Sequence, residues 1–522
     1  MRKSIVLLAA LLLLGAAAHG QQGSLPSDFH RLTIESSHQQ FDATRNAAGM
    51  GLYQPVSGSN TSLEGFYSSG DYHLAQQGAS DRGFRFSTLR YDSFSDKLFM
   101  KGSFFYRLDG EKDRKWSDVM DPWFSIPYIY GSAVAKEYET HDCGLTFDLY
   151  TAPLWDWLSF GVRTTYEVSD ISGKRDPRPR TGYLDWQAVP SLLASFGPHH
   201  VGLDFGYGHT KEKLTNLTTI QSYPNLYYYK MAGLDHVDGA IAAYSGFKRQ
   251  FSGGRWLGDL SYSLTRGPWR ILASGGLEYK RLDANGDKKQ SPGSWNVLTW
   301  NTVVDVEWTR PRALHKLHVT GSLIDGGADE YLQELSSVKD PETGITTETW
   351  VTLYEYTNRY ILGKQDAEAV YTLYGGCRDG QDYRWSATLG AAYSAFAKNE
   401  YLPRSEFDAS GLTANLGGSL LLLDRQGHRI ELAARGSYRI SLNTKQRLFY
   451  DNLYTREVLV PDLDYYNCSW MSAGAELTWQ FPLHLGKAGS ANAYLRLSGN
   501  RLSASDNRSL SSATLAVGLF TF

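Results

Sequence analysis

Few residues of this chain have the types and spacing that catalysis or metal binding requires. The run from Asp283 to Asp287 resembles the start of a calcium loop, but Lys288 and Ser294 replace the glycine and glutamate of an EF-hand. The pair His199 and His200 has no further metal ligand near it in the sequence. No Gly-x-Ser-x-Gly, His-Glu-x-x-His or P-loop pattern occurs. We therefore predict a protein that is not an enzyme and that uses no metal and no cofactor.

The cysteines and the net charge argue against three further classes of protein: disulfide-rich, zinc-binding and nucleic-acid-binding. Cys143, Cys377 and Cys468 are odd in number and widely spaced, which argues against a disulfide framework or a zinc site. The formal net charge is only −3, so we expect no nucleic-acid partner.

The charged residues that invite attention alternate with apolar residues along unusually long segments. Residues 158–168 and 430–440 each have one apolar and one polar face if they are extended, because successive strand residues point to opposite sides. Such a segment is long enough for the roughly 9–11 residues of a tilted strand that crosses a bilayer. An arginine at mid-membrane on the lipid face costs about 2–4 kcal/mol, so the charged face must line the lumen. Four residues are therefore candidates for the lumen: Arg163, Glu167, Arg435 and Arg439.

These segments recur along the chain and predict an all-β protein, a transmembrane antiparallel up-and-down β-barrel of about 16–18 strands. No stretch after the N-terminus approaches 18 apolar residues, which excludes a helical membrane protein. We expect short periplasmic turns, such as 197–199 and 424–428, and long extracellular loops. The long loops are predicted at 110–137, 170–184, 211–236, 326–349 and 441–466.

The predicted order contains one inconsistency. Strands are expected at 237–250, 255–265 and 269–281. Because each strand crosses the membrane once, an odd number of strands would place the long connections before and after this region at opposite ends of the barrel. One assignment within 237–281 must be wrong, or one long loop faces inward. Downstream, 350–362 and 366–376 are predicted as two separate strands. Upstream, 54–60 is predicted as a linker, with hairpins from about Leu63.

The N-terminus predicts export. Arg2 and Lys3 precede an apolar run, and Ala18 and Gly20 fit a signal-peptidase site. We predict three parts: a cleaved signal peptide at 1–20, a periplasmic or lumen-inserted segment at 21–60, and the barrel at 61–522. The predicted location is the outer membrane of a Gram-negative bacterium.

Two loops are rich in aromatic residues. The first contributes the candidate contact residues Trp123, Tyr128 and Tyr130, and the second covers 448–466. Such loops either fold inward to constrict a barrel, stand outward to contact a ligand or partner, or pack against the rim. The basic stretch 174–180 either binds lipopolysaccharide phosphates or is a solvated loop with local ion pairs.

The end of the chain resembles the sorting signal that the barrel-assembly machinery reads. Phe522 is terminal and Phe520 precedes it by two positions in an alternating strand. In the usual signal the glycine lies one position further from the end than Gly518 does here. We predict Phe520 and Phe522 as the assembly signal and that machinery as a partner, together with outer-membrane lipid and lipopolysaccharide.

Several short segments resemble an uncharacterised Gram-negative outer-membrane β-barrel family, a domain of unknown function. They are 46–50 (Asn-Ala-Ala-Gly-Met), 116–122 (Trp-Ser-Asp-Val-Met-Asp-Pro), 176–179 (Asp-Pro-Arg-Pro) and 330–334 (Glu-Tyr-Leu-Gln-Glu), followed by Trp350. The likeness spans nearly the whole mature chain and implies a barrel in the outer membrane without an established substrate. Residues 46–50 are also similar to the Asn-Pro-Ala-Gly-Leu hatch segment of long-chain fatty-acid transporters, with alanine in place of the proline.

Two function classes follow. The first is a porin-like channel or transporter for a small or hydrophobic solute, which makes a small molecule or lipid a possible ligand. The second is a barrel plugged by its own loops that serves as an interaction or structural component with a partner protein. A plug-bearing receptor is disfavoured, because about 40 residues cannot form a separate globular plug.

Overall fold

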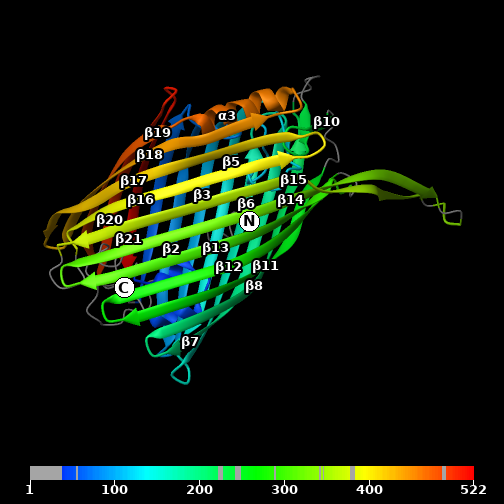
Figure 1. Cartoon of the computed structure of the whole chain (residues 1–522). Coiled ribbons are helices and arrows are strands. Elements are labelled where there is room, and N and C mark those ends of the chain that lie inside the picture. Colours follow the sequence, from blue (N-terminus) through cyan, green and yellow to red (C-terminus); the bar gives the residue numbers. More distant parts are fainter. Residues whose placement is uncertain are drawn as a thin grey trace.

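The chain forms a closed antiparallel barrel of 18 strands (Figure 1). The computed structural model describes residues 38–53, 57–220, 227–241, 248–286, 290–339, 342–344, 346–376, 383–484 and 490–521. Each barrel strand pairs with the next one in the chain, and β1 pairs with β21 to close the ring, Ser59 lying opposite Thr521. This confirms the predicted fold class and strand number.

The barrel strands are β1 Gly58–Gly70, β2 Ser80–Ser95, β3 Leu98–Arg114, β5 Lys136–Thr151, β6 Leu158–Gly173, β7 Arg178–Phe196, β8 His199–Thr218, β11 Arg249–Arg266, β12 Trp269–Asn285, β13 Gly293–Arg310, β14 Ala313–Lys339, β15 Thr346–Gly375, β16 Trp385–Glu400, β17 Ser405–Arg425, β18 His428–Arg447, β19 Trp470–His484, β20 Ser490–Ala504 and β21 Ser509–Thr521. A separate three-stranded sheet contains β4 Tyr130–Gly131, β9 Tyr228–Met231 and β10 Val237–Ile241. The described helical elements are η1 Gln40–Ala43, η2 Ala48–Leu52, η4 Thr455–Leu459 and α3 Val460–Asn467.

The two ends of the barrel differ as predicted. Both chain ends of the barrel and most of the short turns lie at one end, the periplasmic end, where 197–198, 267–268 and 426–427 are typical connections. The long connections 115–135, 219–248 and 448–469 lie at the other, extracellular end. No helix within the described residues is long and apolar enough to span a membrane.

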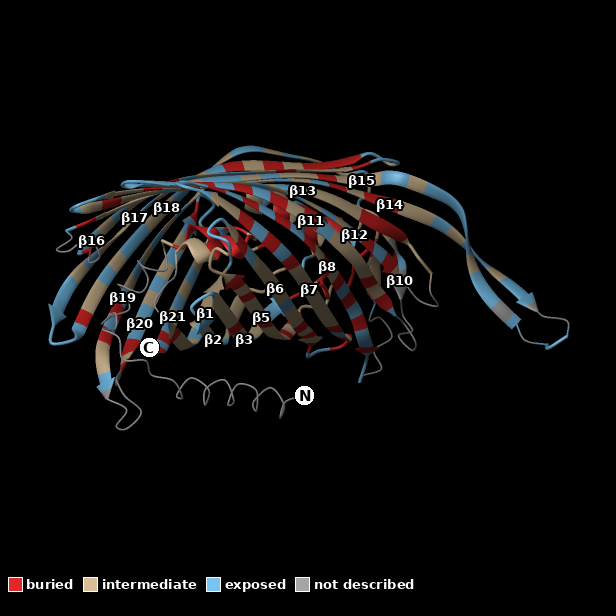
Figure 2. Cartoon of the chain, turned by 90° about the horizontal axis from the view of Figure 1, so that it is seen from below, coloured by how far each residue is buried: buried red, intermediate tan, exposed pale blue. Residues whose placement is uncertain are grey.

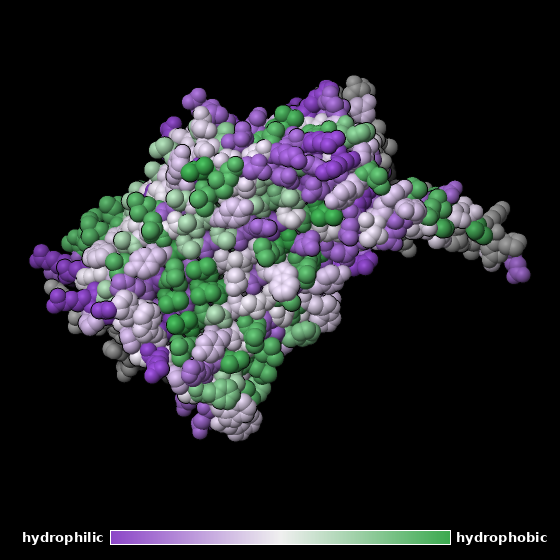
Figure 3. All heavy atoms as spheres, viewed as in Figure 1, coloured by the Kyte–Doolittle hydropathy of each residue, from purple (hydrophilic) through white to green (hydrophobic). Residues whose placement is uncertain are grey.

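The outer face of the wall is apolar and bounded by aromatic residues. Trp157, just before β6, and Tyr166 on β6 are exposed, as are Trp269 and Tyr279 on β12, and each pair is separated by about ten residues, the length of one bilayer crossing. Aromatic side chains of this kind favour the two membrane–water interfaces. Apolar residues also gather over the wall that faces the viewer in Figure 3. The closed wall and its apolar exterior are those of an outer-membrane β-barrel.

Five predictions about the strands and loops were wrong, and the corrections resolve the inconsistency in the predicted order. The predicted long loop 170–184 is mostly strand, since β6 ends at Gly173 and β7 starts at Arg178. Residues 237–250 are not a barrel strand, because β10 ends at Ile241 and belongs to the small sheet. Residues 350–362 and 366–376 lie on the single strand β15. β1 starts at Gly58, within the predicted linker. The predicted loop 326–349 is mostly strand.

The last correction reveals a two-stranded ribbon outside the barrel, formed by residues 331–339 and 346–358. Beyond Glu330, β14 no longer pairs with β13, and before Tyr360, β15 does not pair with β16. Among the described residues, no third strand pairs with either outer edge of the ribbon, which projects from the extracellular end (Figure 1) with largely exposed residues (Figure 2).

The orientation of the wall can be tested with two neighbouring residues of β14. Val319 belongs to the lipid-facing set with Leu317 and Leu323, and Thr320 lines a lumen cavity. We expect Val319→Arg to destabilise the folded barrel by about 2–4 kcal/mol and Thr320→Arg to cost much less. The measurement is urea unfolding in lipid vesicles, followed by the mobility shift between heated and unheated samples on gels. Equal destabilisation by both variants would contradict the assignment of the faces.

Candidate functional site

The periplasmic half of the lumen holds the segment 38–53, which we call the inner segment. Its apolar residues Phe41, Ala48 and Met50 are buried and pack against Tyr150 and Leu193 of the wall. It carries the two short helical turns η1 and η2. The inner segment therefore occupies part of the cross-section of the barrel near its periplasmic end.

Charged groups attach the inner segment to two parts of the wall, the β5–β6 pair and the β11–β12 pair. Arg45 lies 3.3 Å from the Asp259 carboxylate of β11 and 2.6 Å from the Glu278 carboxylate of β12. Arg163 of β6, one of the predicted lumen residues, donates to Asp148 over 2.7 Å and to the carbonyl oxygen of Thr44. Each of these charges is satisfied within the lumen, away from lipid. The inner segment is held by ion pairs and hydrogen bonds in addition to its apolar contacts.

Residues 46–50, which carry the resemblance noted above, fit closely against the wall. The Asn46 side chain accepts from the amide of Gly49 over 2.8 Å and donates to the carbonyl of Leu192 over 3.1 Å. The amide of Ala48 donates to the Ser191 hydroxyl over 3.0 Å. On β6, a Cβ atom at Gly161 would lie 2.3 Å from the backbone nitrogen of Ala48. Glycine at 161 therefore permits this close approach.

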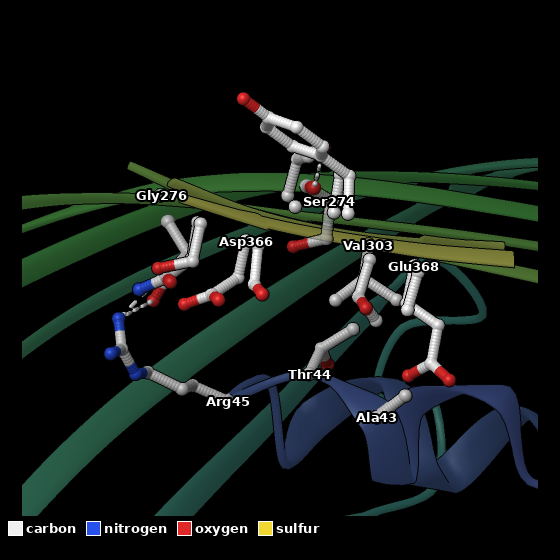
Figure 4. A pocket seen from close by; sticks show the side chains of 18 residues that line it. Ala43, Thr44, Arg45, Ser274, Gly276, Val303, Asp366 and Glu368 are labelled. Atoms are coloured by element: carbon white, nitrogen blue, oxygen red, sulfur yellow. Dashed lines mark hydrogen bonds and ion pairs between the residues drawn. The ribbon is translucent and has the colours of Figure 1, made fainter. Parts of the chain in front are cut away.

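A cavity of about 610 Å³ lies between the inner segment and the wall formed by β11 to β16. Asp366 and Glu368 project from β15 toward Thr44 and Arg45 of the inner segment (Figure 4). The remaining lining is mainly small and hydroxyl-bearing or amide side chains, among them Ser274, Asn301, Thr320, Ser322 and Ser394. This volume is in the range of small-molecule sites, and the groups on offer are hydrogen-bonding and acidic.

The extracellular half of the lumen is filled by loops that fold inward, which we call the outer plug. It comprises the described parts of 115–135, 227–241 and 448–469, and its apolar residues form one buried cluster with the wall. Trp116 and Ile126 of the first loop and Leu234 of the second pack with Trp295 and Phe407 of the strands. Of the three arrangements open for the aromatic loops, the structure has the inward one.

A buried ion network anchors the first loop of the outer plug. The Arg249 guanidinium of β11 lies 2.8 Å from the Glu212 carboxylate of β8 and 3.5 Å from the Asp118 carboxylate of the loop. Arg249 and Asp118 are each 1% exposed, so neither charge is stabilised by water. Burial raises the pKa of Asp118, and Arg249 opposes this rise by favouring the charged carboxylate.

The third loop contributes η4, α3 and their flanks. Tyr454, Val458 and Leu459 belong to the buried cluster, and the Trp116 indole donates to the Glu457 carboxylate over 2.9 Å. Arg439 of β18, another predicted lumen residue, donates to the carbonyl of Cys468 over 3.3 Å, just after α3. Arg439 therefore supports the end of this loop.

The other predicted residues lie apart from the cavity lining. On the inner face of the wall, Glu167 is half-buried on β6 and Arg435 is exposed on β18. Tyr128 and Tyr130 are buried in the outer plug, so they offer no surface to an external partner, and Trp123 is half-buried there. The structure does not bring the predicted residues together into one site.

Two further predicted features can be placed. In the basic stretch 174–180, Lys174, Arg178 and Arg180 each pair with a nearby carboxylate, which matches the reading of local ion pairing. Phe520 is fully buried and packs on Tyr494, and Phe522 lies outside the described residues.

Sequence reasoning missed the residues that form the cavity and the anchors. Arg45 and Asp259 are 214 positions apart, and no local pattern joins them. Asp366 and Glu368 are two residues apart in a strand and therefore share a face, which was an available signal for a polar wall.

The close approach at Gly161 predicts the effect of one methyl group. We expect Gly161→Ala to displace the inner segment, because the new Cβ would overlap the backbone of Ala48. Tryptic cleavage after Arg45 in the detergent-solubilised protein measures this displacement and should accelerate. Gly363→Ala is the matched control, since a Cβ there has no atom within 4 Å. Equal cleavage in both variants would refute the assignment.

The buried ion network predicts that removal of Arg249 strongly destabilises the first loop of the outer plug. Arg249→Met removes the cation between Asp118 and Glu212, and leaving buried charge unpaired costs about 3–5 kcal/mol. Hydrogen exchange of amides in 115–135 should therefore accelerate strongly. The exposed pair of Arg180 and Asp170, 2.7 Å apart, supplies the control, since Arg180→Met should cost about 0–1 kcal/mol. Unchanged exchange in Arg249→Met would show that the network does not hold the loop.

Comparison with known proteins identifies the family and no individual relative. No curated protein matches the sequence. Among solved structures, the ferric yersiniabactin uptake receptor FyuA from Yersinia pestis is 11% identical, with 90% of this chain and 81% of that chain covered and a TM-score of 0.35. The ferric citrate transporter FecA is 11% identical, with 89% and 78% covered and a TM-score of 0.40. The copper transporter OprC is 7% identical, with 89% and 80% covered and a TM-score of 0.39.

The TM-scores show that these structures superpose only loosely on this barrel, and we infer nothing about this chain from them. The family model described as "Family of unknown function (DUF6850)" matches residues 47–521, from the inner segment to the last strand. The chain belongs to this family of unknown function.

Proposed function

We propose that the protein is a gated outer-membrane conduit for a small hydrophilic solute. The observation that carries the proposal is the polar cavity of about 610 Å³ next to the inner segment. The role proposed is passage of a solute and not catalysis.

The lining supports a hydrophilic solute over a hydrophobic one. Hydroxyl, amide and carboxylate side chains line the cavity, and an apolar solute would desolvate them without replacing their hydrogen bonds. The apolar surface of the barrel lies instead on the outside and within the outer plug.

The attachment of the inner segment supports its role as a gate. Its ion pairs with the wall involve Arg45, which is 23% exposed, so water reaches the pair and can replace its contacts when the segment moves. We propose that the inner segment closes the periplasmic side and that movement of the outer plug opens the extracellular side. Lipid, lipopolysaccharide and the barrel-assembly machinery are proposed partners, and the signal peptide at 1–20 stays a prediction.

A second candidate function is the docking of a partner protein, and the ribbon favours it. Leu332, Val338, Val351 and Tyr354 are exposed on it, outside both membrane and barrel. Its acidic residues outnumber its basic ones, which favours a partner with a basic surface. Its two outer strand edges, which pair with no described strand, also offer backbone hydrogen bonds to an added strand.

Planar-bilayer recording of the purified full-length protein tests the conduit. Arg45→Ala removes the ion pairs to Asp259 and Glu278, so we expect longer and more frequent open steps than in the wild type. Adding Ala48→Cys and Ser191→Cys introduces two thiols on neighbouring residues, since the Ala48 amide donates to the Ser191 hydroxyl over 3.0 Å. Oxidation of this pair should abolish the steps, and a reductant should restore them.

Arg45→Ala with Ala48→Cys alone is the control for oxidation and should remain open. Silent bilayers with every reduced variant would exclude the conduit and favour the docking function. Steps that persist in the oxidised double-cysteine variant would show that the inner segment is not the gate.

A further inference from the structure

The carboxylates of the lumen cavity differ in their partners. Glu368 is exposed to the cavity and makes no hydrogen bond or ion pair with any residue that the structure describes. Asp259 and Asp366 each face a cation, Arg45 for the first and Lys364 for the second. The cavity therefore combines one free carboxylate with two occupied ones.

The two cations that occupy these carboxylates connect the cavity to the closing elements. Arg45 belongs to the inner segment. Lys364 lies 2.6 Å from the Asp366 carboxylate, and its ammonium is 4.9 Å from the ring centroid of Phe124 in the outer plug. A ligand that competes for Asp259 therefore competes with a contact of the inner segment, and one that competes for Asp366 competes with a wall cation, Lys364, that also contacts the outer plug.

We propose that the cavity binds a small organic cation, with one or more amino groups, in competition with Arg45 and Lys364. This proposal rests on the conduit function proposed above and names the class of its solute. The ligand's ammonium groups would pair with Glu368 and with Asp366 or Asp259, and its polar atoms would meet the hydroxyls of Ser274, Thr320 and Ser394. Displacement of Arg45 from Asp259 would remove one of its two ion pairs with the wall and loosen the inner segment, so binding favours opening.

The geometry favours an organic cation over a metal ion. No group of three or more His, Cys, Asp or Glu residues in the described part of the chain is arranged to hold a metal ion. The cavity is also many times larger than one ion needs, and its hydroxyl-rich lining suits a molecule with several polar atoms.

The test is thermal unfolding of the detergent-solubilised full-length protein at physiological ionic strength, read as the mobility shift on gels. The probes are putrescine and succinate, a diamine and a diacid with four carbons each. We expect putrescine to raise the unfolding temperature and succinate to leave it unchanged, because a ligand that binds the folded state stabilises it. In Asp366→Asn/Glu368→Gln, the putrescine concentration for half-maximal shift should rise at least tenfold.

Two further variants distinguish the site from general charge effects. Glu167→Gln removes a carboxylate from the inner wall outside the cavity lining and should leave the putrescine response unchanged. Arg45→Ala removes the competing cation and should lower the half-maximal putrescine concentration severalfold, an effect that a merely structural role would not produce.

The proposal fails if putrescine has no effect on the wild type, if succinate or magnesium chloride acts equally well, or if Arg45→Ala weakens the response. These outcomes are independent of conductance. A putrescine response without any open steps would uphold the site and remove the conduit, whereas open steps without a putrescine response would do the reverse.

Discussion

Everything in this molecule depends on a single constraint, that charged and hydrogen-bonding groups must be kept out of the surrounding hydrocarbon. The backbone meets the constraint by closing the sheet on itself, so that no strand edge faces lipid. The side chains meet it by alternating, which sends arginines and carboxylates into the lumen. Once inside, those charges need partners, and the inner segment and the outer plug supply many of them. The contents of the barrel are therefore a consequence of its wall.

The inner segment and the outer plug are held in different ways. The outer plug combines a large apolar cluster with the buried network of Arg249, Asp118 and Glu212, so that opening it exposes apolar surface and unpairs charges. The inner segment is smaller, and Arg45 and Asp42 of its ion pairs are partly exposed. Lys364 and Asp366 lie between the two, since Lys364 contacts Phe124 of the outer plug and Asp366 lines the cavity beside the inner segment.

The fold was largely predictable because alternation and strand length are local properties. Segments such as 158–168 show both faces directly, and so Arg163 and Arg439 could be assigned to the lumen. β1 was partly missed because Gly58–Gly70 is rich in glycine and serine, which read as a linker. The ribbon was missed because its polar residues resemble those of a loop, although they pair strand to strand. Contacts such as that of Arg45 with Asp259 depend on the shape of the closed barrel, and a sequence pattern does not contain that shape.

The pairing of β1 with β21 has a consequence for the assembly of the barrel. Because the first and last strands form the seam, the ring stays open until the final residues of the chain have been synthesised and laid down. The inner segment immediately precedes β1, so it can settle onto an uncurled sheet instead of being threaded through a finished pore. Pairing of β1 with β21 then encloses the inner segment, so the lumen receives this segment before the barrel is complete.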